Sequence, residues 1–132
     1  MSKSAVSTAA PEHFPHTQQA PRFLPLETIR VRLLAPPHTD RRPVFGIMSN
    51  MSETGACIIT NLSLPVGVTV GLSIDNRHQK APLEISARIV WCAERFEAVK
   101  EIVGYLTGVC FDSGSVDSVR PLLGSGLFQA IP

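Results

Sequence analysis

The chain has little of the material that several classes of protein require. Its 132 residues include three cysteines, one tryptophan and one tyrosine, and only 6% are aromatic. Twelve Lys and Arg stand against eleven Asp and Glu, so the formal charge is +1. A balance this close to neutral supplies no broad positive field for binding DNA, RNA or an anionic membrane. Any bound anion must therefore be held by local groups.

Long apolar runs are also missing. No stretch approaches the roughly twenty apolar residues that cross a bilayer, and the first residues, MSKSAVSTAAPEH, contain no hydrophobic signal-peptide segment. The odd-numbered set of cysteines, Cys57, Cys92 and Cys110, is spread along the chain among apolar neighbours, as reduced core thiols are. We therefore expect a cytoplasmic protein with no disulfide bonds and no membrane insertion.

The histidines do not indicate catalysis or metal binding. All four fall in the predicted arm or in predicted turns, at His13, His16, His38 and His78. No nucleophile and base pair stands out, and Pro15 separates the only two closely spaced histidines, which lack the further ligands of a four-coordinate site. The sequence favours a protein that is not an enzyme and has no metal or cofactor.

The length favours a single domain behind a short arm. Residues 1–21 are rich in Ser, Ala, Thr, Gln and Pro and offer few large apolar side chains to bury, which predicts a flexible arm. We expect the folded domain to occupy residues 22–132.

Apolar residues alternate with polar ones in several short runs, which is typical of half-buried strands. The runs predict six strands at residues 29–34, 44–49, 56–60, 68–74, 83–91 and 104–111. In the fifth, Trp91 shares the apolar face of Leu83, Ile85, Ala87 and Ile89, and is expected to face the core. Six strands joined by Gly, Pro and Asn turns predict an all-β fold, a six-stranded antiparallel barrel whose closure removes exposed edges.

Two segments fit this pattern less simply. Residues 93–103 are charged, with apolar residues at helical spacing, and are predicted to be a helical or irregular excursion of a hairpin. Residues 116–123 predict a short C-terminal helix with Ser115 as its cap, weakened beyond its first turn by Pro121.

The connection between the second and third strands is the most informative stretch, because it concentrates Asn, Ser and Gly. One interpretation is a plain turn, in which Asn50 and Ser52 satisfy backbone groups and Gly55 takes a backbone angle that other residues avoid. The other is that Asn50 and Ser52 point outward and hydrogen-bond a ligand, with arginines nearby if the ligand is a nucleotide. The residues alone leave both open.

A family resemblance bears on this choice. The chain resembles the PilZ domain from Arg22 to about Leu123, through Asn50-x-Ser52-x-x-Gly55, then Gly71-Leu72, Ile89-Val90-Trp91 and Gly108-Val109-Cys110-Phe111. The resemblance implies a six-stranded barrel with a C-terminal helix that binds the bacterial second messenger cyclic di-GMP and relays it to a protein partner. It further implies that Asn50 and Ser52 contact a guanine or its phosphate, and that Gly55 lets the backbone approach the ligand.

The family also carries an Arg-x-x-x-Arg element before its first strand. Arg22 matches the second arginine, but Gln18 stands at the first position and Gln19 where many members carry another. Nearby Arg30, Arg32, Arg41 and Arg42 are further cations of the type usually found on a solvated surface.

Three alternatives follow for the function. The leading hypothesis is a non-catalytic receptor that binds cyclic di-GMP through Arg22, Asn50, Ser52 and Gly55. The second is a degenerate PilZ-like adaptor that no longer binds the nucleotide and acts through protein partners. A third, a small barrel that binds single-stranded nucleic acid, fits poorly because aromatic platforms are few.

Overall fold

The computed structural model describes residues 20–34, 44–76, 80–96 and 102–131, apart from the side chains of residues 95, 96, 102 and 103. Several sequence predictions lie outside these ranges. They concern the arm over residues 1–19 with Gln18 and Gln19, the turn with Arg41 and Arg42, and all four histidines.

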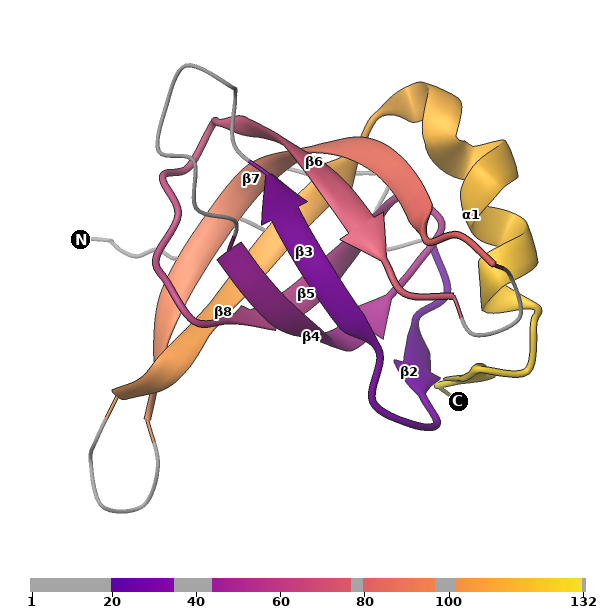
Figure 1. Ribbon diagram of the computed structural model, residues 1–132, viewed down its shortest axis with the longest axis horizontal. Helices are drawn as coiled ribbons and strands as arrows, with labels where there is room; N and C mark the ends of the chain where they lie inside the picture. Colours follow the sequence, from indigo (N-terminus) through magenta and orange to yellow (C-terminus); the bar gives the residue numbers. More distant parts are fainter. Residues whose placement is uncertain (1–19, 35–43, 77–79, 97–101, 132) are drawn as a thin grey trace.

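Six strands of the described chain close into an antiparallel barrel, as the sequence predicts (Figure 1). They are β3 (Arg30–Leu34), β4 (Val44–Met51), β5 (Gly55–Thr60), β6 (Thr69–Ile74), β7 (Leu83–Phe96) and β8 (Ile102–Phe111). Neighbours follow the order β3, β6, β7, β8, β5, β4, and the pairing of β3 with β4 closes the ring. Closure leaves each of these strands hydrogen-bonded on both sides, which removes the free edges that promote aggregation.

Alternation places one face of each strand in the barrel interior. Val31 and Leu33 of β3 are almost fully buried, whereas Arg30 and Arg32, which alternate with them, are exposed. The interior is filled by branched aliphatic side chains, among them Ile58, Leu72, Ile74 and Ile89. Burial of these side chains is the main source of stability and fixes the register of each strand.

Two short strands that the sequence analysis missed extend the sheet beyond β4. They are β2 (Phe23–Pro25) and β9 (Phe128–Ala130), which pair with each other, and β2 also pairs with β4 through Phe23 and Met51. At three residues each, they are too short for an alternation pattern to show. The ribbon ties the two ends of the domain together, and the C-terminus lies beside β2 (Figure 1).

The C-terminal helix α1 (Val116–Leu123) follows a 3-10 turn at Ser113–Ser115. Its apolar side packs on the barrel through Val119, Leu122 and Leu123, and the following Leu127 and Phe128 are buried as well. Ser115 occupies the N-cap position without a side-chain capping hydrogen bond, and the helix continues past Pro121. Packing of the apolar side therefore outweighs the missing cap and the lost hydrogen bond at the proline.

The prediction of a helical or irregular excursion over residues 93–103 is wrong where the structure describes it. β7 continues to Phe96, β8 begins at Ile102, and the two strands project together beyond the barrel (Figure 1). Residues 97–101 lie outside the described ranges. No helix in the described parts of the chain is long and apolar enough to cross a membrane.

Candidate functional site

The Asn50 end of β4 begins a row of paired residues that crosses four strands. Asn50 pairs with Cys57, Cys57 with Gly108, and Gly108 with Trp91. Directly paired residues of an antiparallel sheet project on the same face. Because Ile58, next to Cys57, points into the core, this row lies on the outer surface of the barrel.

The middle of that surface is formed by small residues. A second outward row pairs Gly55 with Cys110 and Cys110 with Arg88. We call Gly55, Cys57, Gly108 and Cys110 the floor. None of these four residues has a large side chain, although Gly55, Cys57 and Gly108 are buried and Cys110 alone of the four is partly accessible.

Gly55 is required for a different reason from the one predicted. The glycines with a positive φ among the described residues are Gly67, Gly104 and Gly126, so the expected special backbone angle at Gly55 is wrong. Instead, a Cβ atom at Gly55 would collide with the carbonyl oxygen of Val109 on the neighbouring strand. Close approach of β8, not turn geometry, selects glycine here.

Trp91 lies on the outer face, which corrects its predicted place in the core. The register of β7 against β8 shifts between Ile89 and Trp91, so Val90 is the extra residue of a β-bulge. A bulge reverses the inward and outward alternation of the residues that follow it. The indole therefore lies over Gly108, where an added Cβ would collide with the ring, and Trp91 is half-buried at the edge of the floor. Three consecutive apolar residues, at 89–91, were the sequence signal for this break in alternation.

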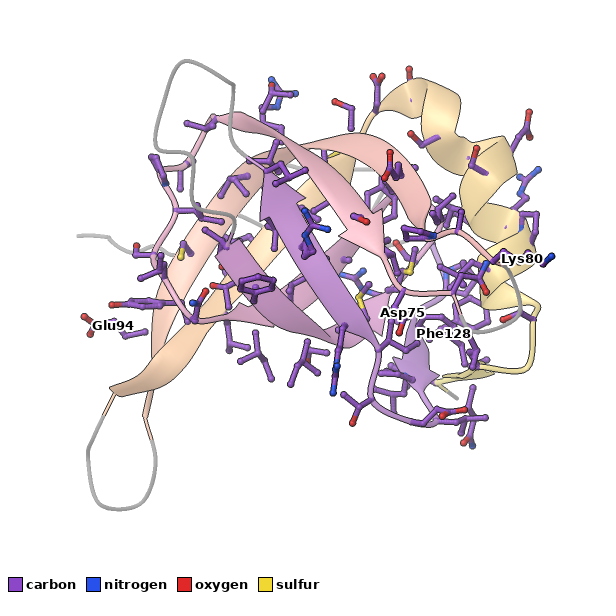
Figure 2. The ribbon with its side chains drawn as sticks, in the orientation of Figure 1. Asp75, Lys80, Glu94 and Phe128 are labelled. Carbon is purple, nitrogen blue, oxygen red and sulfur yellow. The ribbon has the colours of Figure 1, made fainter. Side chains whose placement is uncertain are left out.

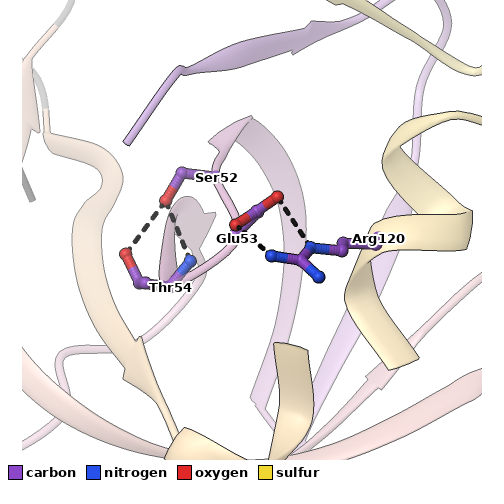
Figure 3. A network of polar contacts seen from close by, with 4 residues as sticks. All are labelled: Ser52, Glu53, Thr54 and Arg120. Atoms are coloured by element: carbon purple, nitrogen blue, oxygen red, sulfur yellow. Dashed lines mark hydrogen bonds and ion pairs between the residues drawn. The ribbon is translucent and has the colours of Figure 1, made fainter. Parts of the chain in front are cut away.

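Ser52 is used by the turn between β4 and β5. Its side chain is buried, and its Oγ accepts hydrogen bonds from the backbone N–H groups of Thr54 and Gly55, each at 3.2 Å. The backbone N–H of Ser52 also donates to the carbonyl of Gly55 at 2.8 Å. Figure 3 shows the serine folded back onto Thr54. These contacts are those of the turn interpretation, and they fix how β4 enters the turn.

Asn50 contrasts with Ser52. A register shift between Met48 and Asn50 adds a residue to β4 at this point. The side-chain oxygen Oδ1 of Asn50 is buried, yet no hydrogen-bond donor among the described residues reaches it. A buried acceptor without a partner is uncommon and destabilising, and such atoms are often completed by a ligand or water.

Arg22 lies beside the same row. Its backbone carbonyl accepts a hydrogen bond from the N–H of Ile131 at 2.9 Å, and Phe23 pairs with Met51, so the ribbon of β2 and β9 positions it next to the end of β4. Partial burial lowers the pKa of Arg22, although the guanidinium stays charged at physiological pH, and the residue as a whole remains exposed. Burial raises the pKa of the Cys57 thiol, opposed by the positive charge of Arg22 and by a hydrogen bond with Ser49. The surface therefore holds a fixed cation beside a neutral thiol.

An ion pair joins the same turn to the helix. The Nε of Arg120 lies 3.0 Å from Oε2 of Glu53, and its Nη2 lies 3.5 Å from Oε1 (Figure 3). Glu53 raises the pKa of Arg120 by hydrogen bonding and by its charge. The Arg120 side chain is 60% exposed and that of Glu53 37% exposed, so solvent screens the pair and it adds little stability. It does fix where the turn lies relative to α1.

The structure thus gathers Arg22, Asn50 and Gly55 around one outer face, with Ser52 holding the adjoining turn. Among the described residues, no three His, Cys, Asp or Glu side chains cluster as a metal site would need.

A family model of the PilZ domain matches residues 16–129. The chain belongs to the PilZ domain family. The match includes Arg22, the segment from Asn50 to Gly55, and the barrel with its helix. Curated protein sequences contain no match to the chain.

Solved PilZ structures share the fold. One is the PilZ domain of YcgR from Escherichia coli, solved with c-di-GMP, at 14% identity and a TM-score of 0.63, covering 81% of this chain and 88% of that one. Another is the inhibitor of motility MotI/DgrA from Bacillus subtilis, also 14% identical, with a TM-score of 0.53. It aligns with 80% of this chain, which spans about half (51%) of its length. The TM-scores show a common fold, and at 14% identity they show nothing beyond it.

Proposed function

We propose that this PilZ protein is a non-catalytic receptor that binds cyclic di-GMP on the outer barrel face and changes a surface read by a protein partner. The observation that carries the proposal is the buried Oδ1 of Asn50, which has no donor among the described residues. Asn50 pairs with Cys57, whose thiol interacts with the positive charge of Arg22. A guanine edge presents N–H donors to an amide oxygen, and a guanidinium hydrogen-bonds guanine or phosphate. The YcgR domain, of the same fold, was solved with this nucleotide.

Each residue takes a role that its position allows. Arg22 supplies charge and paired donors, Asn50 supplies the free acceptor, and Gly55 belongs to the floor over which the ligand lies. Trp91 adds an aromatic wall at the far edge of that floor, where an indole stacks on a purine. Ser52 takes part through the turn that presents Asn50, and its direct contact with the nucleotide remains a prediction.

The test is isothermal titration of the full chain with cyclic di-GMP, with GTP as the control for general nucleotide affinity. We expect saturable binding to the cyclic dinucleotide and none to GTP. Arg22→Ala should weaken binding about 5- to 150-fold, which corresponds to about 1–3 kcal/mol for a bidentate arginine contact. Gln18→Arg, which restores the first arginine of the family element, should strengthen it.

Arg32→Ala is the matched control, because Arg32 is an exposed arginine on β3, away from the floor. It should leave the affinity unchanged. If no heat is released at high ligand concentration and the melting temperature does not move, the receptor proposal fails. The degenerate adaptor, to which Gln18 and Gln19 point, then becomes the better explanation.

A further inference from the structure

A concave feature separate from the floor lies on the outer faces of β3, β4 and β5. It is a groove of about 680 Å³ whose lining includes Arg30, Arg32, Phe45, Ile47, Ile59 and Ser73, together with Asp75 and Pro82. Figure 2 shows Asp75 at the end of β6, beside the start of β3. The volume falls within the range of about 300–1,000 Å³ that is common for binding pockets.

Large apolar side chains stand in this groove without cover. Phe45 is 53% exposed and Ile47 is 45% exposed, and the two are neighbours on the outward face of β4. Register places Arg32 opposite Phe45, and Arg30 opposite Ile47. An apolar patch bordered by polar groups on an otherwise solvated surface is typical of an interaction site.

The groove carries more positive than negative charge, which favours an acidic partner. Two arginines stand on one outward face of β3, about 7 Å apart as expected for alternate residues of a strand. Asp75 is the single carboxylate among the lining residues, and no ion pair links Arg32 to a carboxylate of the described chain. An occupant that brings carboxylates beside apolar side chains would match this arrangement. A second copy of the chain would match it less well, because the same face of that copy brings two arginines and only one carboxylate, Asp75.

We propose that the groove docks an acidic, apolar segment of a protein partner. The apolar side chains of the segment cover Phe45 and Ile47, and its carboxylates pair with Arg32 and Arg30. Desolvation by the apolar contacts strengthens these charge-assisted hydrogen bonds. This inference goes beyond nucleotide binding and does not require it, so it is tested without nucleotide.

The experiment is selection from a random library of displayed twelve-residue peptides on the immobilised full chain. We expect enrichment of peptides in which Asp or Glu stands next to Leu, Ile or Phe. Binding of a selected peptide, measured by fluorescence anisotropy, should weaken at least about tenfold in Arg32→Glu and in Phe45→Ser, a loss typical of a central contact. Both side chains are exposed, so neither variant should disturb folding.

Arg88→Glu is the matched control, since Arg88 is an exposed arginine on the outward face of β7, away from the groove. It should leave peptide affinity unchanged, as should Arg22→Ala. The proposal is overturned if no peptide is enriched, if the enriched peptides lack acidic residues, or if Arg88→Glu weakens binding as much as Arg32→Glu does.

Discussion

The floor and the groove lie on neighbouring parts of one barrel surface and differ in the size of their side chains. The floor is made by Gly55, Cys57, Gly108 and Cys110, whereas Phe45, Ile47 and two arginines stand in the groove. A surface of small residues beside the Trp91 indole suits the face of a planar ring, and a hollow between large side chains suits the side chains of a peptide. The same barrel can therefore present two unlike ligands side by side, because outward residues are free of the packing that fixes the interior.

The largest expected effect comes from filling the floor. Gly55→Ala should destabilise the protein by at least about 3 kcal/mol, the upper end of the usual cost of overpacking, because the new Cβ meets the carbonyl of Val109. Urea denaturation measures the change. Gly71→Ala is the control, since the nearest atom to its Cβ would be a carbonyl oxygen at 4.0 Å. Equal stability of Gly55→Ala and the parent would show that β8 can move away.

If the floor binds cyclic di-GMP and the groove binds a peptide, single substitutions should remove one binding activity and leave the other. Trp91→Ala should weaken cyclic di-GMP binding by about 1–3 kcal/mol, the usual contribution of an aromatic stacking contact, and leave peptide binding intact. Phe45→Ser should do the reverse. Titration of both variants with both ligands measures this, and Trp91→Phe, which keeps a ring, should retain most of the nucleotide affinity. If Phe45→Ser weakens nucleotide binding as much as Trp91→Ala does, the two surfaces are one site.

Replacing Ser52 and replacing Asn50, which lie next to the floor, should affect stability and nucleotide affinity in opposite ways. Ser52→Ala leaves two backbone N–H groups without their acceptor and should cost about 1–2 kcal/mol of stability. Asn50→Ala removes an acceptor that has no donor among the described residues, so stability should not fall, while nucleotide affinity should. Thermal unfolding of both variants, and their titration with cyclic di-GMP, distinguish a residue that stabilises the turn from one that binds the ligand. A loss of stability in Asn50→Ala would show that its oxygen has a partner in the free protein.

The smallest effect concerns pH. Burial raises the pKa of Cys57 in the folded protein above its value in the unfolded chain, usually about 8.5. As pH rises above about 8.5, the unfolded chain binds fewer protons than the folded one, so the free energy of unfolding falls. Cys57→Ala should show a shallower loss of stability than the parent between about pH 8.5 and 10. Parallel curves would mean that the thiol is not desolvated.

Much of the fold could be predicted because burial repeats every second residue along each strand. The alternation in residues 29–34 and 83–89 marks the inward faces that the structure shows. Prediction failed where a local event breaks the period, as the bulge at Val90 does before Trp91. It also failed for β2 and β9, whose pairing depends on segments about a hundred residues apart in the chain.

The candidate site likewise contains residues that the sequence predicted and residues that only the structure revealed. Arg22, Asn50 and Gly55 were predicted from the family resemblance, and the structure brings them to one face. The roles of Cys57, Gly108 and Trp91 were not predicted, because only cross-strand register makes them neighbours. The groove has no sequence motif, since its lining comes from short pieces of β3, β4 and β5 that lie far apart in the sequence.

The sequence by itself determined an all-β barrel of six strands with a closing helix and membership of the PilZ family, because period and motif are local properties. Tertiary structure alone decided that Ser52 holds a turn, while the oxygen of Asn50 has no donor among the described residues. It also decided that Trp91 faces outward and that a floor of small residues borders a cationic, apolar groove. These features arise from register, bulges and close backbone approach, which are set by contacts between strands and not by the residues of any one strand.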